Sequence, residues 1–339
     1  MVEEYTYTAQ DFKSDNEIRW CPGCGDHAII NSVQRTMATL GIAHEKFAII
    51  SGIGCSSRLP YYMSTYGFHS IHGRAAAVAT GVKLANPDLS VWVITGDGDS
   101  LAIGGNHFIH VVRRNVDINL VMFNNKIYGL TKGQYSPTSD KGLVTKTSPF
   151  GTIEEPFSPG MLTIGAGGKF YARAIDNNVK QTQEILEIAA KHKGTSIVEV
   201  LQNCVIFSDG VHDEIAGIKN RAERQLYLQD GKPMIFGTDN EKGLVFENGK
   251  LKVVTIGENG YALDDILVHD AKNPDPSVHI ALINMCLPDF PVAIGVIRNV
   301  EAPTYDEEMI SQIESVKQRR RVTNVEELFH SGNTWRVES

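Results

Sequence analysis

Short apolar runs alternate with longer amphipathic stretches through the first 200 residues of the chain. The apolar runs predict buried strands, and the amphipathic stretches between them predict helices. This alternation is typical of an α/β protein with a doubly wound, mostly parallel sheet that helices cover on both faces. Strands are expected at residues 47–50, 90–95, 118–123, 169–174 and 196–201, and helices at residues 26–40, 73–85, 101–114 and 181–192.

The alternation is interrupted once and then stops. Residues 132–168 are rich in Gly, Pro, Ser and Thr, and a loop of this length is usually functional or lies at an interface. Beyond residue 210 the clearest signal is a hairpin in GLVFENGKLKVV, with Asn248-Gly249 as its turn. We therefore expect a cofactor-binding domain over residues 1–210 and a C-terminal extension over residues 211–339 that packs on the core or on a partner subunit.

Polar residues follow two of the predicted strands. Gly96-Asp97-Gly98 comes directly after one strand, and Asn125 closes another. The carboxyl ends of parallel strands meet at one edge of a sheet, where ligands bind. Carboxylate and amide oxygens suit a Mg²⁺ ion that bridges a diphosphate, and the glycines let the backbone approach the phosphates. The pair favours thiamine diphosphate over the alternative of two ordinary polar turns.

Four of the five cysteines fall in loops that the predicted topology brings to the same edge. Cys21 and Cys24 form a Cys-x-x-Cys before the first helix, while Cys55 and Cys204 follow strands. Four thiolates could hold one tetrahedral zinc ion or one 4Fe–4S cluster, and the spacing does not choose between them. The alternative is that these cysteines are ordinary buried residues. Cys286 lies in the apolar run LINMCLP and is expected in the core.

Composition restricts the class of protein only broadly. The chain has 339 residues, 42% of them hydrophobic and 21% charged, with a formal net charge of −8. These values are typical of a soluble globular protein, and the negative charge argues against a nucleic-acid partner. No apolar run approaches the roughly 20 residues that a membrane span needs. The N-terminus is acidic and polar, so we expect no secretory signal, a cytoplasmic location and no disulfides.

At this point the sequence resembles a known family. The segments WCPGCG, GIGCSSR, IHGRA, GDGDSLAIGGNHFIH and NNKIYGLTKGQ, with the late Cys204, resemble the β subunit of the 2-oxoacid:ferredoxin oxidoreductases. The resemblance covers roughly residues 15–215 in order. The YGLTKGQ segment looks most like the enzymes that act on 2-oxoglutarate. The last third of the chain carries no motif of this kind.

The resemblance implies a set of cofactor ligands. Asp97, Asn125 and the backbone carbonyl of Ile127 would bind Mg²⁺. The four cysteines Cys21, Cys24, Cys55 and Cys204 would ligate a 4Fe–4S cluster that takes electrons from thiamine diphosphate. The diphosphate and the rest of that cofactor would contact Gly96, Gly98, Asp99, Ser100, Gly129 and Leu130.

Three further residues are candidates for contact with substrate or cofactor. His72 and Arg74 lie at the start of a predicted helix, which suits an anion. The alternative is a solvated loop with a structural arginine. Lys132 follows the cofactor loop and could pair with the distal carboxylate of 2-oxoglutarate, although surface lysines are common.

The implied reaction is oxidative decarboxylation of 2-oxoglutarate with coenzyme A to succinyl-CoA and CO₂, or the reverse carboxylation. Electrons would pass from thiamine diphosphate through the cluster to ferredoxin. The activating carboxylate of thiamine enzymes comes from a pyrimidine-type domain, which is expected on a separate α subunit in an α₂β₂ complex. This chain alone should then be inactive, and ferredoxin should dock near the cluster. The alternatives are pyruvate or another 2-oxoacid as substrate, a non-redox thiamine enzyme with zinc, and a non-catalytic metal-binding scaffold.

Overall fold

A computed structural model describes residues 5–319, 322 and 324–338 of the chain. Its centre is an eight-stranded sheet in the order β2-β1-β3-β4-β8-β7-β13-β9. The first six strands of this order run parallel, whereas β13 is antiparallel to β7 and parallel to β9. The expected mostly parallel sheet is therefore confirmed. The strands are β1 Phe47–Ser51, β2 Tyr66–His69, β3 Ser90–Gly96, β4 Asn119–Asn124, β7 Phe170–Ile175, β8 Ser196–Leu201, β9 Gln225–Leu228 and β13 Val292–Asn299.

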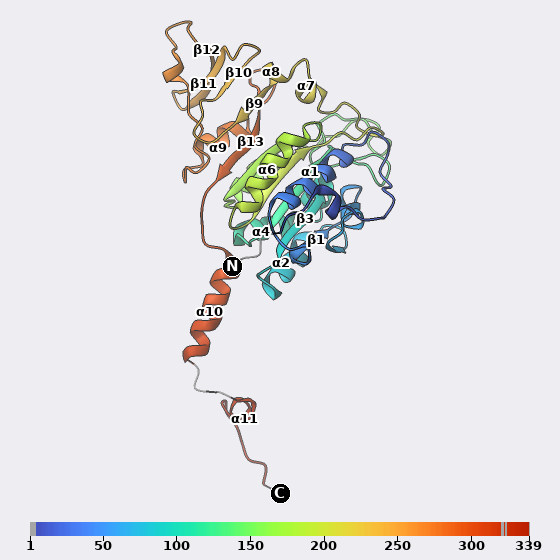
Figure 1. Cartoon of the computed structure of the whole chain (residues 1–339), viewed down its shortest axis with the longest axis vertical. Coiled ribbons are helices and arrows are strands. Elements are labelled where there is room, and N and C mark those ends of the chain that lie inside the picture. The colour runs from blue at the N-terminus through green and yellow to red at the C-terminus, as the bar shows by residue number, and fades with distance from the viewer. Residues whose placement is uncertain (1–4, 320–321, 323, 339) are drawn as a thin grey trace.

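Helices cover both faces of this sheet (Figure 1). On one face α1 and α6 pack against each other and against a core cluster that includes Phe123 and Val198. On the other face α2 and α4 pack together over a cluster that includes Val93 and Leu120. The helices are α1 Asp26–Thr39, α2 Ala75–Ala85, α3 Asp97–Leu101, α4 Gly105–Arg114, α5 Pro159–Gly165, α6 Val179–Lys191, α7 Asp213–Ala216, α8 Arg221–Arg224 and α9 Ser277–Ile283, with the short 3₁₀ turns η1 Ala9–Phe12, η2 His44–Lys46, η3 Ser56–Tyr62 and η4 Leu263–Asp265.

The central strands form where the apolar runs predict them because both of their faces are covered. Every residue of β7 and β8 is buried, as is every residue of β1. Burying one large aliphatic or aromatic side chain contributes about 1.5–3 kcal/mol. Among the residues of these three strands, only Arg173 and Glu199 carry charged side chains, and these two pair with each other.

The single helix expected over residues 101–114 is in fact two helices, so that expectation is wrong in detail. Helix α3 already begins at Asp97, and the chain bends at Ala102, where φ is −85° and ψ is −105°. A Cβ atom at Gly104 would lie 2.4 Å from the backbone oxygen of Asp99. The close approach of these two backbone segments breaks the helix and requires a glycine, and α4 begins only at Gly105.

Two strands from beyond residue 210, β9 and β13, belong to the central sheet. A separate three-stranded sheet contains β10 Ile235–Phe236, β11 Lys242–Glu247 and β12 Lys250–Thr255. The hairpin predicted at Asn248-Gly249 is confirmed, since these residues connect β11 to β12 with φ values of 51° and 78°. Helices α10 Tyr305–Arg319 and α11 Val325–Phe329 extend away from the body of the molecule (Figure 1).

Cys286 is exposed, so its expected place in the core is wrong. It lies in the turn after α9, where the neighbouring Met285 is the residue that packs into the core. An apolar run that continues past the end of a helix no longer keeps one face toward the core. In the part of the chain that the structure describes, no helix combines the length and the apolar character needed to cross a membrane.

Candidate functional site

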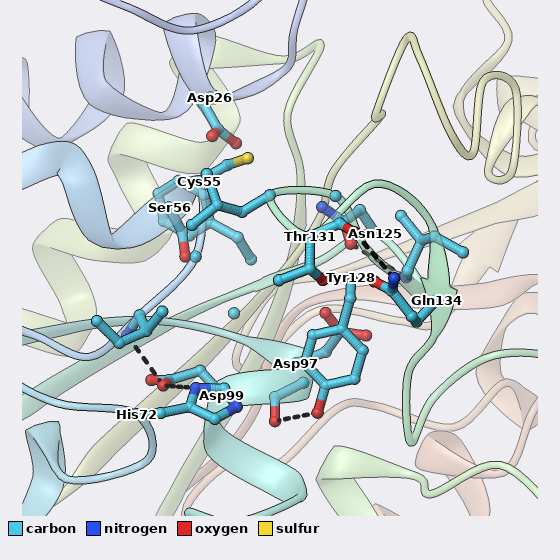
Figure 2. A pocket seen from close by; sticks show the side chains of 18 residues that line it. Asp26, Cys55, Ser56, His72, Asp97, Asp99, Asn125, Tyr128, Thr131 and Gln134 are labelled. Atoms are coloured by element: carbon cyan, nitrogen blue, oxygen red, sulfur yellow. Dashed lines mark hydrogen bonds and ion pairs between the residues drawn. The ribbon is translucent and has the colours of Figure 1, made fainter. Parts of the chain in front are cut away.

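The predicted strand-end residues meet at one edge of the sheet. There they surround a cavity of about 570 Å³ (Figure 2). It lies where β3 and β4 end, because these strands run parallel and in register. The cavity is lined by eight of the residues expected to bind cofactor or Mg²⁺, which are Gly96, Asp97, Gly98, Asp99, Asn125, Ile127, Gly129 and Leu130. Ser100 does not line this cavity and is buried.

Asp97 is the first residue of α3 and is almost fully buried. Its Oδ2 accepts hydrogen bonds from the hydroxyls of Ser136 and Thr138, each at 2.5 Å. Burial raises the pKa of Asp97 to about 6, although both hydroxyls act to lower it. A carboxylate held in this way is ready for a cation, which would compensate its buried charge.

The two adjacent asparagines at the end of β4 have different surroundings. Asn125 lines the cavity, and its Oδ1 accepts a hydrogen bond from the backbone N–H of Ile127 at 3.2 Å. Asn124 is buried and donates from Nδ2 to Oε1 of Glu199 at 2.7 Å. After this turn, β5 Ile127–Tyr128 pairs with β6 Gln134–Tyr135 in a short ribbon. The turn therefore points one amide at the cavity and ties the other to the core.

The wall of the cavity accepts only glycine at position 98. A Cβ atom there would lie 2.2 Å from the ring of Tyr128, whose hydroxyl donates to the backbone oxygen of Gly98 at 2.9 Å. The backbone is thus open to a ligand along this loop. The carboxylate of Asp97, the amide oxygen of Asn125 and a backbone carbonyl form a hard oxygen set. This donor chemistry fits Mg²⁺ and a diphosphate.

The cysteines come together beside the same cavity. Cys55 lines it, and the Sγ atoms of Cys55 and Cys204 lie 3.7 and 3.5 Å from the point that a Cβ of Gly129 would occupy. Burial and, to a lesser extent, the charges of Asp26, Cys204 and Cys21 together raise the pKa of the Cys55 thiol to about 12. Burial and Asp26 also raise the pKa of Cys24.

These thiols resist ionisation unless a cationic centre stabilises them, and four such donors fit an iron–sulfur cluster. Within residues 5–319, 322 and 324–338, no group of three or more His, Cys, Asp or Glu side chains is placed to hold a single metal ion. A four-iron cluster is larger than one ion, so its ligands stand further apart.

The three candidate substrate residues lie in different surroundings. His72 lines the cavity, and its Nδ1 is 2.8 Å from Oδ1 of Asp99 (Figure 2). The Arg74 guanidinium lies outside the cavity lining and donates to the backbone oxygens of His72 and Ile103 at 3.4 and 3.5 Å. Lys132 is exposed and also lies outside the lining. The cavity thus brings His72 to the site, while contact of Arg74 or Lys132 with a ligand stays a prediction.

Sequence reasoning missed several residues of the site. Tyr128, Thr131 and Gln134 line the cavity. Residues 136–140, which we call the strap, cross over Asp97 through Ser136 and Thr138. The Tyr128 position lies within NNKIYGLTKGQ and could have been singled out there. The strap carried no signal beyond the polar composition of its loop.

Comparison with known proteins agrees with this geometry. Residues 52–200 match the family described as "Thiamine pyrophosphate enzyme, C-terminal TPP binding domain". The chain is 46% identical to 2-oxoglutarate oxidoreductase subunit KorB of Mycobacterium tuberculosis, over 97% of this chain and 88% of that protein. It belongs to the β subunits of the 2-oxoacid:ferredoxin oxidoreductases.

Two further relatives extend the comparison. This β subunit is 45% identical to 2-oxoglutarate synthase subunit KorB of Archaeoglobus fulgidus, over 55% of this chain and 69% of that protein. A solved structure of 2-oxoglutarate:ferredoxin oxidoreductase from Magnetococcus marinus, with 2-oxoglutarate, coenzyme A and succinyl-CoA bound, superposes with a TM-score of 0.77. The two chains are 32% identical, and the match covers 97% of each. The fold of this β subunit is therefore that of the family along nearly its whole length.

Proposed function

We propose that this β subunit carries the thiamine diphosphate site and the first electron acceptor of a 2-oxoglutarate:ferredoxin oxidoreductase. The observation that carries the proposal is that one cavity is lined by both Asp97 with Asn125 and by Cys55. The reaction needs a carbanion-forming cofactor and a one-electron acceptor close together. A single strand-end cavity with hard oxygen donors and converging thiols supplies both sets of ligands.

In this proposal Asp97, Asn125 and the Ile127 carbonyl hold Mg²⁺, and the glycine loop around Gly98 cradles the diphosphate. Bound thiamine diphosphate would supply the carbanion that attacks the 2-oxo group and releases CO₂. The protein's own contribution is to orient and enclose the reactants. His72 presents an imidazole to the cavity, oriented by its contact with Asp99. Cys21, Cys24, Cys55 and Cys204 hold the 4Fe–4S cluster.

The substrate is proposed to be 2-oxoglutarate, with coenzyme A as the acyl acceptor. The relatives' names support this choice, because two of them are a 2-oxoglutarate oxidoreductase and a 2-oxoglutarate synthase subunit. Lys132 remains our candidate for the distal carboxylate, although in this chain it is exposed outside the cavity lining. A Lys132→Met variant should then raise KM for 2-oxoglutarate and leave KM for a substrate without that carboxylate unchanged.

The partners are proposed to be an α subunit with the pyrimidine-type domain, in an α₂β₂ complex, and a ferredoxin that docks near the cluster. Support comes from the relatives, several of which are named as β subunits of 2-oxoacid:ferredoxin oxidoreductases. We further propose that part of residues 211–339 contacts the α subunit.

The decisive experiment is reduction of a viologen dye by the anaerobically purified complex of this chain with its α subunit. Reduction is compared with 2-oxoglutarate and with pyruvate, with and without coenzyme A. We expect reduction that depends on coenzyme A and strongly prefers 2-oxoglutarate. A preference for pyruvate would retain the reaction and refute the substrate. No reduction with any 2-oxoacid, from a complex shown to contain thiamine diphosphate and iron, would refute the redox function.

A further inference from the structure

A charged group of side chains is buried in the central sheet and contacts Asn124 at the end of β4. Glu199 on β8 and Arg173 on β7 form an ion pair at 2.8 Å, and both side chains are more than nine-tenths buried. The hydroxyl of Tyr171 donates to the same oxygen of Glu199, Oε2, at 2.5 Å. Burial alone would raise the pKa of Glu199. The charge of Arg173 and the hydrogen bonds from Arg173, Tyr171 and Asn124 nevertheless hold this pKa below its usual value.

A buried ion pair of this kind adds little net stability, because desolvation offsets the attraction between the charges. Its retention is better explained by what its remaining contact does. Oε1 of Glu199 accepts from Nδ2 of Asn124 at 2.7 Å. Since a carboxylate can only accept, this contact fixes which way the amide of Asn124 points. Oδ1 of Asn124 must therefore face away from Glu199.

On that other side lies the hydroxyl of Thr138. Its Oγ1 is 2.9 Å from Oδ1 of Asn124 and 2.5 Å from Oδ2 of Asp97. All of these atoms are buried, and Thr138 itself is only 2% exposed. Both of these oxygens are acceptors and Thr138 has a single hydroxyl hydrogen, so it donates to one of them at a time, and to Asp97 when that carboxylate is ionised.

The strap also holds the other half of the site. Ser139 donates to the backbone oxygen of Lys126 at 2.5 Å, and Asp140 forms an ion pair with the Lys126 side chain at 2.7 Å. One five-residue segment is thus attached both to Asp97 and to the turn that carries Asn125. The two strap hydroxyls contact only Oδ2 of Asp97 and do not occupy its other carboxylate oxygen.

We propose that Thr138 is a positioning residue, which fixes the Asp97 carboxylate relative to the Asn125 turn, while Glu199 holds the adjacent Asn124 amide so that its Oδ1 faces Thr138. The inference rests on the proposed function, since Asp97 and Asn125 are its Mg²⁺ ligands. Residues that orient metal ligands typically contribute about 10–100-fold to metal affinity. Thr138 has this role without touching the metal itself.

The test measures binding of thiamine diphosphate at a fixed Mg²⁺ concentration to the complex with its α subunit. Thr138→Val removes the hydroxyl and keeps the shape, and we expect it to weaken binding about 10–100-fold. Thr138→Ser keeps the hydroxyl and should restore affinity to within a few-fold of the unaltered complex. Thr36→Val is the matched control, because Thr36 is also fully buried but donates only within and beside α1.

The outcomes separate this inference from the proposed function. If the unaltered complex binds no thiamine diphosphate, the proposed function fails. If it binds and Thr138→Val binds equally well, only the positioning role is refuted. A loss that Thr36→Val shares, or that Thr138→Ser does not reverse, would show a general structural effect and would also overturn the proposal.

Discussion

At the scale of single residues, the site depends on a buried carboxylate whose charge no cationic side chain of the described residues neutralises. Asp97 is buried against two hydroxyls, and no Lys or Arg in the described chain forms an ion pair with it. A buried carboxylate without a cationic partner is unfavourable. The bound Mg²⁺ proposed above removes this cost, so the affinity for the cofactor should depend strongly on the Asp97 side chain.

Asp97→Asn keeps the size and shape of the side chain but removes its charge. We expect thiamine diphosphate and Mg²⁺ to bind more than about 100-fold more weakly, since a direct ligand contributes more than its supporting contacts. Equilibrium binding to the complex with the α subunit measures this loss. Asp88→Asn serves as the control, because Asp88 is highly exposed and does not line the cavity. Unchanged affinity in Asp97→Asn would contradict the assignment of Asp97.

The cysteines allow a comparison within one chain. Cys55→Ser should lose the 4Fe–4S cluster, because Cys55 lies with the other thiols at the cavity, whereas Cys286→Ser should retain it, because Cys286 is exposed beyond α9. Iron and acid-labile sulfide, measured in anaerobically purified protein, distinguish the two. Equal iron and sulfide contents in the two variants would rule out Cys55 as a ligand.

The sequence predicted those site residues that directly follow buried strands. Asp97 and Asn125 could be found because strand ends in a parallel sheet share an edge. Thr138 and Ser136 could not, because their contacts with Asp97 depend on the path of a long loop, which no periodicity encodes. Glu199 stood within an apolar strand, where its partner on the neighbouring β7 becomes visible only once the strand order is known.

At the scale of elements, β13 and α9 are joined by buried histidines. His279 on α9 accepts at Nδ1 from the Arg298 guanidinium at 2.9 Å, and its Nε2 contacts the backbone oxygen of Asp270. His269 contacts the backbone oxygen of Val296 on β13. Burial lowers the pKa of His279 below its usual 6.5, and the charges of Arg298 and His269 lower it further. Burial likewise lowers the pKa of His269.

These shifts predict how stability depends on pH. The folded protein binds fewer protons at His279 than the unfolded chain, so the stabilisation is present above pH 6.5 and is lost as the pH falls below it. One histidine contributes a slope of at most about 1.4 kcal/mol per pH unit. Between pH 7.5 and pH 5.5, we expect the thermal midpoint of the unaltered protein to decrease by more than that of His279→Gln. An equal fall in both proteins would exclude His279 as the cause.

Elements could be predicted where their own residues determine them. Strands β1, β3, β4, β7 and β8 appear where apolar runs stand, because each is covered on both faces. The break between α3 and α4 could not be predicted, since it arises from the approach of Gly104 to the backbone at Gly73 and Asp99. Strand β13 pairs antiparallel with β7 through residues that lie more than 100 positions apart in the sequence. A local sequence pattern cannot predict a pairing between such distant segments.

At the scale of the whole molecule, the site lies in a cavity at the sheet edge, whereas α10 and α11 project far from the body (Figure 1). Helix α11 and the residues after it expose large apolar side chains, among them Phe329 and Trp335. These features suit a chain that works within a larger assembly.

We therefore expect the isolated chain to show no 2-oxoglutarate-dependent dye reduction, even when it contains iron, sulfide and added thiamine diphosphate. Mixing it anaerobically with separately purified α subunit should restore activity in proportion to the complex formed. Size-exclusion chromatography and the dye assay on the same fractions provide the measurement. Turnover by the chain alone would show that the activating carboxylate lies within these 339 residues.

The position of β13 has a consequence for how the chain is made on the ribosome. Strand β7 is complete by residue 175, but the neighbour that covers its outer side is not synthesised until residues 292–299. Until then a strand that is apolar except for Arg173 has unpaired backbone groups along one side, which is a template for misassembly with other nascent chains. Shortened versions of this chain that stop near residue 210 should consequently accumulate as insoluble protein, and co-expression with a chaperone should matter more for them than for the complete chain.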